Sequence, residues 1–183
     1  MINTDFSLPE GATFKGQLKT TSKTSTDRSA SASILSSTGS TLIINNTRLE
    51  YLTFTASNLT GSGYLQVAEL GNGAMSVIID HCAFDGVNGP DSQGAAINGA
   101  INEGSIYISS TTFNNVVASS SGASVYVYGF NNSISFDKCV FSGTRSATDV
   151  YGFGAKLTFT ACTPNAPNTY PSLVCSGNTC TSP

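Results

Sequence analysis

Charged residues are scarce in this sequence. Asp, Glu, Lys and Arg make up 10% of the 183 residues, and the formal net charge is −3. A chain without a basic patch cannot neutralise a row of phosphates, so we do not expect nucleic acid as a partner. Tryptophan is absent, and His81 is the only histidine. The five cysteines form no Cys-x-x-Cys pair, so the sequence predicts no zinc knuckle, and nothing in it indicates a metal or a cofactor.

Long hydrophobic runs are missing as well. No segment approaches the roughly eighteen uninterrupted apolar residues that a membrane-spanning helix needs. The N-terminal residues also lack the charged and apolar regions of a secretory signal peptide. The chain is therefore either a mature or recombinant fragment or a protein that is not secreted by that route, and we favour a fragment of an extracellular or cell-surface protein.

What the sequence does contain is a repeat. One motif reads apolar, any, apolar, two polar residues, Cys or Thr, any residue and usually an aromatic; its copies begin at Val77, Ile106 and Ile134, with weaker copies at Leu42 and Leu157. A second motif opens with glycine followed by small and apolar residues, and its copies begin at Gly63, Gly94 and Gly122. Both motifs recur about every 28 residues and stay in phase, which indicates a structural repeat.

The repeats predict an all-β fold. Each copy alternates apolar and polar residues and is rich in β-branched and aromatic types, as in short, half-buried strands. Strands this short bury their apolar faces by stacking on copies of themselves. The sequence thus predicts a single-stranded right-handed parallel β-helix (solenoid) of about five to six coils. We expect residues 41–164 to form the repeats, residues 1–40 an N-terminal cap or arm, and residues 165–183 a C-terminal cap or tail.

Stacked coils place equivalent residues in ladders, about 4.8 Å apart. An inward aromatic ladder is predicted for Phe84, Phe113 and Phe141, continued weakly by Leu49. A second ladder of small residues is predicted for Cys82, Thr111, Cys139 and Cys162. Burial of such ladders is the expected source of stability.

The C-terminal segment does not follow the pattern of the repeats. Cys175 and Cys180 enclose a Gly-Asn turn, which predicts a local disulfide of the kind found in oxidising compartments. Several prolines after Pro164 disfavour a further ladder strand. Cys139 and Cys162 occupy one ladder position in successive coils, so a bond and two buried thiols both remain open.

The two motifs resemble those of a known repeat family. A Gly-Ala strand and a strand ending in Cys/Thr-x-Phe, best seen in Thr112–Asn115 followed by Gly122–Tyr126, are similar to the repeats of polymorphic outer-membrane proteins and related adhesins. The similarity covers roughly residues 42–164, although the double glycine and a regular asparagine after phenylalanine are lacking. The resemblance implies a pectate-lyase-like β-helix, a surface location and, more weakly, adhesion.

Some β-helices act on polysaccharides, so acidic residues and the histidine of this sequence are candidate catalytic groups. Asp80 and Asp137 align two coils apart, a separation compatible with an inverting glycosidase pair, although aspartate is also a common turn former. His81 follows Asp80, but neighbouring strand residues point to opposite faces, so no relay is expected. We expect the oxygen-rich loop from Asp85 to Asp91 to form a turn rather than a calcium site. We therefore assign no catalytic or metal-binding residue.

Three Asn-x-Ser/Thr sequons would accept glycans in a secreted eukaryotic protein, at Asn45, Asn58 and Asn131. The predicted function is a non-enzymatic extracellular structural or adhesive surface module. Its partners would be other protein subunits, including copies stacked head to tail into a filament, or surface glycans. The alternative is a carbohydrate-binding or polysaccharide-degrading β-helix.

Overall fold

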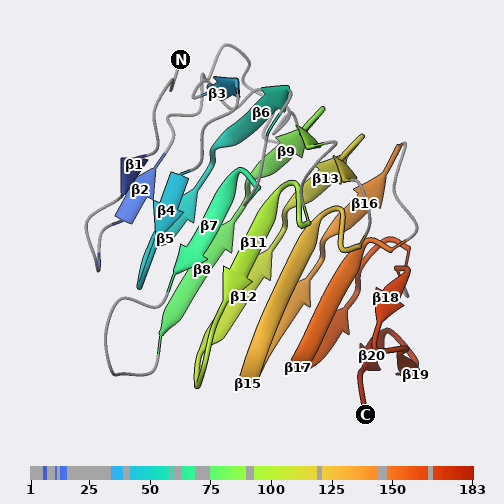
Figure 1. Ribbon diagram of the computed structural model, residues 1–183. Helices are drawn as coiled ribbons and strands as arrows, with labels where there is room; N and C mark the ends of the chain where they lie inside the picture. The colour runs from blue at the N-terminus through green and yellow to red at the C-terminus, as the bar shows by residue number, and fades with distance from the viewer. Residues whose placement is uncertain are drawn as a thin grey trace.

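The computed structural model is a parallel β-solenoid, as predicted (Figure 1). It describes residues 6–7, 11, 13–15, 34–38, 42–57, 59, 63–68, 75–89, 93–118, 121–143, 148–164 and 167–183. Strands stack in sequence order along the solenoid, and none of these residues forms a helix able to cross a membrane.

Three strips of parallel strands make up the walls. Sheet I contains β1 (Phe6–Ser7), β4 (Leu42–Ile44), β7 (Leu65–Ala68), β11 (Ile97–Ala100), the first parts of β15 (Val125–Asp137) and β17 (Val150–Thr160), and β18 (Thr169–Tyr170). Sheet II contains β2 (Thr13–Lys15), β5 (Arg48–Glu50), β8 (Ser76–Asp80), β12 (Ser105–Ser109) and the second parts of β15 and β17. Sheet III contains β3 (Ile34–Thr38), β6 (Thr53–Ser57), β9 (Ala83–Asp85), β13 (Thr112–Asn114) and β16 (Val140–Ser142). The long strands β15 and β17 join sheets I and II, and β10 (Asn88–Gly89) pairs with β14 (Val117–Ala118).

The number of regular turns differs slightly from the prediction. About three turns share the period of about 28 residues, rather than five to six coils. Spacing outside the regular turns varies in both directions: it is shorter from Leu42 to Leu65 and from Val150 to Thr169, and longer from Phe6 to Leu42. Loop length varies freely in a solenoid because only the strands must be in register.

The earliest predicted copy, beginning at Leu42, lies one sheet away from its predicted place. The prediction puts Leu49 in the column of Phe84. Instead, Leu42 pairs with Leu65 in sheet I, Leu49 lies in sheet II, and Phe54 pairs with Phe84 in sheet III. A strand that alternates apolar and polar residues can bury its apolar side chains in any of the three sheets. The local pattern therefore does not reveal which sheet the strand joins.

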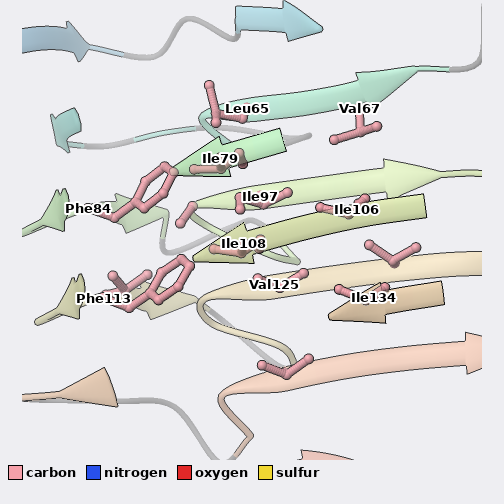
Figure 2. Packing of buried hydrophobic residues seen from close by; sticks show 14 of the residues in the cluster. Leu65, Val67, Ile79, Phe84, Ile97, Ile106, Ile108, Phe113, Val125 and Ile134 are labelled. Atoms are coloured by element: carbon pink, nitrogen blue, oxygen red, sulfur yellow. The ribbon is translucent and has the colours of Figure 1, made fainter. Parts of the chain in front are cut away.

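Aliphatic and aromatic columns fill the interior (Figure 2). Phe54, Phe84, Phe113 and Phe141 stack face to face, with ring centroids 4.8, 5.1 and 5.1 Å apart. All four side chains are buried. Each aromatic pair adds roughly 0.5–1.5 kcal/mol beyond the burial of its area, so this column contributes to the stability of sheet III.

The C-terminal segment closes the last coil. After β18, strands β19 (Val174–Ser176) and β20 (Thr179–Thr181) form an antiparallel hairpin, and β20 pairs with the end of β17. The predicted disulfide between Cys175 and Cys180 ties the hairpin together. Strand β18 continues sheet I by two residues, so this segment both extends and terminates the solenoid.

Candidate functional site

One corner of the solenoid repeats an unusual backbone conformation. Five residues between sheets II and III have φ between +47° and +55°: Tyr51, His81, Ser110, Lys138 and Ala161. The amides of the first four donate to carbonyls one coil further on, and that of Ala161 donates to the Asn178 carbonyl of the C-terminal hairpin; for example, the amide of His81 donates to the Ser109 carbonyl at 3.0 Å. The coils therefore present one side chain each along this corner.

This conformation brings His81 and Asp80 together, contrary to expectation. His81 Nδ1 lies 2.9 Å from Asp80 Oδ1, and the imidazole stacks on the Tyr51 ring with centroids 5.0 Å apart. The prediction that the two side chains point to opposite faces is wrong, because alternation holds only for extended residues and His81 has a φ of +50°.

Asp80 is the centre of a small polar network. The Ser109 hydroxyl donates to Asp80 Oδ1 at 2.5 Å, and the Arg48 guanidinium lies 3.9 Å from Oδ2. Burial acts to raise the pKa of Asp80, but the hydrogen bonds from Ser109 and His81 and the nearby positive charges lower it overall. Ser109 donates to the carboxylate rather than to His81, so the three residues do not form a serine nucleophile triad.

A groove of about 530 Å³ runs along this corner and across the outer face of sheet III. Its lining includes the corner side chains of Tyr51, His81, Ser110 and Lys138. Asp80 and Asp137 occupy one column on either side of Ser109, as the alignment predicts, but neither lines the groove. Lys138 Nζ lies 3.8 Å from Asp137 Oδ2. The two acids therefore lie outside the groove, within hydrogen-bond and ion-pair networks of the wall.

The predicted oxygen-rich loop is partly described. Asp85 Oδ1 accepts a hydrogen bond from Asn114 at 2.8 Å, and Ser142 donates to Asn114 Oδ1 at 3.1 Å. This side-chain ladder links three coils along sheet III. Asp91 lies outside the described residues, and within the described ranges no three His, Cys, Asp or Glu side chains gather to hold a metal.

The three remaining cysteines are buried free thiols. Cys82, Cys139 and Cys162 each donate to carbonyls of their own coil and of the preceding one, at 3.4–3.7 Å, and the Thr111 hydroxyl bonds the Ser109 carbonyl at 2.8 Å. A small buried side chain that donates hydrogen bonds at this position pairs with the backbone carbonyls that point into the interior at this corner. Burial raises the pKa of Cys82 to about 12, which suits a structural thiol and not a nucleophile.

The three sequons differ in accessibility. Asn45 is only 4% exposed, which disfavours it as a glycan acceptor in the folded chain. Asn131 is exposed and remains a candidate. Asn58 lies outside the described residues.

The most distinctive surface lies on sheet I and on the adjoining irregular stretch of β15 at Phe130, and the sequence pattern did not reveal it. Outward-facing rings gather on β15, β17 and β18; this aromatic face consists of Tyr126, Tyr128, Phe130, Tyr151, Phe153 and Tyr170. Tyr126, Tyr151 and Tyr170 stack with centroids 4.9 and 4.8 Å apart. Phe130 is 70% exposed and Phe153 is 52% exposed. The available signal was Tyr-x-Tyr in one coil and Tyr-x-Phe in the next, at positions whose neighbours are buried.

A hollow of about 590 Å³ adjoins the aromatic face at the C-terminal end of the solenoid. Strand β18 pairs with the beginning of β17 and β20 with its end, which leaves the stretch from Gly152 to Lys156 as the floor. Phe153, Tyr170 and Pro171 form part of the wall, together with Thr181 and Ser182. The small floor residues Gly152, Gly154 and Ala155 leave this space open.

Comparisons with protein-family models, curated proteins and solved structures gave no match. The β-solenoid is thus established by the structure, and the resemblance to adhesin repeats gains no support from a relative.

Proposed function

We propose that the chain is a non-enzymatic, extracellular adhesive or structural module that contacts its partner through the aromatic face. The observation that carries this proposal is the cluster of exposed rings on β15, β17 and β18. Exposed side chains such as Phe130 and Phe153 leave apolar area in water, and contiguous apolar patches usually mark interaction surfaces. Tyrosine is suited to such surfaces because its ring is rigid and its hydroxyl forms hydrogen bonds.

Other strands already cover the end of the last coil, and this affects how copies of the chain would associate. Head-to-tail stacking needs a free strand edge at each end of a solenoid. Pairing of β20 with Thr158–Thr160 and of β18 with Val150–Tyr151 already occupies much of that edge on β17. Self-association through the side of the solenoid, where the aromatic face lies, therefore fits better than a head-to-tail filament.

Adhesion of protein-coated beads tests the proposal. Wild-type beads are expected to adhere to collagen, dextran or sialylated mucin above an albumin background, or the protein to self-associate in light scattering. The double variant Tyr128→Ser/Phe153→Ser should lose that behaviour, because it removes two rings that are 47% and 52% exposed. The matched control is Tyr107→Ser on β12, whose side chain is 43% exposed on another sheet.

Two outcomes would contradict the proposal. A wild-type protein that stays monomeric and adheres to none of these surfaces has no contact function of this kind. Alternatively, turnover of a pectin-like or capsule-like polysaccharide that disappears in Asp80→Asn would favour the second candidate, a polysaccharide-degrading enzyme. That candidate is favoured by one observation, the hydrogen bond that orients His81, which lines the groove, against Asp80.

A further inference from the structure

We infer that the hollow beside Tyr170 binds a glycan ending in a single carboxylated sugar, an inference that rests on the proposed function and names its ligand class. The hollow combines an aromatic wall with hydrogen-bonding groups, which few ligand classes match. A sugar ring has an apolar C–H face and a polar rim of hydroxyls. Its face fits against Tyr170 or Phe153, and its rim reaches Thr181.

The arrangement of rings decides where a sugar can stack. Within the column, Tyr151 is covered by Tyr126 on one side and by Tyr170 on the other. Tyr170 is the last ring of this column among the described residues, and it is 48% exposed. Tyr151 is therefore covered on both faces, whereas Tyr170 ends the column beside the hollow and has no further ring of this column stacked on its outer side.

Charge selects an acidic ligand. Lys156 is the one charged side chain among the described residues that line the hollow, and within that part of the chain it has no salt-bridge partner. The protein as a whole is acidic, with a formal net charge of −3, so this ammonium is a local exception. A carboxylate placed beside it would form a charge-assisted hydrogen bond.

The single cation also limits the size of the ligand. A polymer with a carboxylate on every sugar, or a nucleic acid, would need a row of cations to neutralise it. One lysine in a hollow at the end of the aromatic face fits one terminal acidic sugar. The uncharged rings next to it, Tyr128 and Phe153, would contact the neutral sugars that precede the terminus.

A matched pair of oligosaccharides tests the inference. In ligand-observed NMR titrations, 3′-sialyllactose should bind and lactose, which lacks the acidic sugar, should bind at least about tenfold more weakly. Lys156→Gln should reduce the affinity for 3′-sialyllactose by about tenfold or more and flatten its salt dependence. Lys138→Gln, which removes an exposed lysine in the corner groove, is the control and should change neither.

The stacking component is tested at Tyr170. Tyr170→Ala should weaken 3′-sialyllactose binding about threefold to tenfold, while Tyr170→Phe keeps the ring and most of the affinity. Equal affinity for lactose and 3′-sialyllactose, or equal effects of the two lysine variants, would overturn the inference. Binding of a tetraglutamate peptide with the same Lys156 dependence, without sialyllactose binding, would replace the glycan by an acidic peptide. If 3′-sialyllactose does not bind but wild-type beads still adhere through the aromatic face, the inference fails and the proposed function stands.

Discussion

At the scale of single residues, backbone conformation decides what the corners of this solenoid present. A residue with positive φ turns the chain where a strand must end, and non-glycine residues in that region are uncommon. Here such residues are stacked coil upon coil, and His81 owes its contact with Asp80 to this geometry. Period-two alternation describes the strands well and says nothing about the residue that follows them.

Two glycines share the same φ, so substitutions at them distinguish backbone strain from steric collision. Gly86 and Gly94 both have φ of +63°. A Cβ on Gly86 meets nothing within 4 Å, whereas one on Gly94 collides with the Ile97 carbonyl oxygen and lies 2.7 Å from Tyr126 Cβ. Gly86→Ala should cost about 1–2 kcal/mol from left-handed strain alone, and Gly94→Ala more than about 3 kcal/mol.

Urea denaturation of both variants measures these costs as the free energy of unfolding. Equal destabilisation by the two alanines would show that the close approach at Gly94 relaxes without cost. A larger effect at Gly94 would confirm that the second repeat motif needs glycine because the next coil packs against it.

At the scale of elements, short strands are held by columns of identical side chains. Sheet III consists of strands of three to five residues, too short to be stable alone. The phenylalanine column crosses four of them, and Phe113 stacks on a ring in both neighbouring coils. Loss of one ring therefore removes contacts on both sides of its coil.

Phe113→Ala should lower the free energy of unfolding by about 3–5 kcal/mol, because it leaves a cavity in the middle of the column. The adjacent control Thr112→Ala, on a half-buried outward-facing side chain, should cost less than about 1 kcal/mol. Both values are read from chemical denaturation followed by circular dichroism. Similar costs for the two variants would mean that the column is not the main support of sheet III.

At the scale of the whole molecule, a solenoid is nearly one-dimensional, because each coil contacts only its neighbours. The C-terminal hairpin touches the rest of the described chain through β17, and the Cys175–Cys180 disulfide holds the hairpin strands together. The stabilisation by the disulfide should therefore be local to the hairpin and β17, and it should decrease with distance along the solenoid.

Replacing both Cys175 and Cys180 by serine should destabilise the hairpin by about 2 kcal/mol, the value expected for closing a short loop. Hydrogen exchange of the β17 and β20 amides should accelerate, while exchange in β8 and β12 stays unchanged. Wild-type protein treated with a reductant is the control and should show the same pattern. Uniform acceleration through all coils would instead show that the cap stabilises the solenoid as one cooperative unit.

The sequence by itself determined the architecture, because period-two alternation that recurs in phase at a nearly constant spacing has few solutions other than stacked coils. The local disulfide followed from spacing and a turn, both of which are properties of neighbouring residues. Phe84, Phe113 and Phe141 share one column because their repeat copies align without a gap.

Tertiary structure alone decided the rest. Which sheet receives Leu42 depends on loop lengths that a local pattern does not reveal. Whether Asn45 is buried, and whether His81 meets Asp80, depends on the turn of the backbone at each corner. The aromatic face exists because successive coils place Tyr126, Tyr151 and Tyr170 in register, although these residues are far apart and unevenly spaced along the chain. Such separations are ordinary in the sequence, and only the stacking of coils converts them into neighbours about 4.8 Å apart.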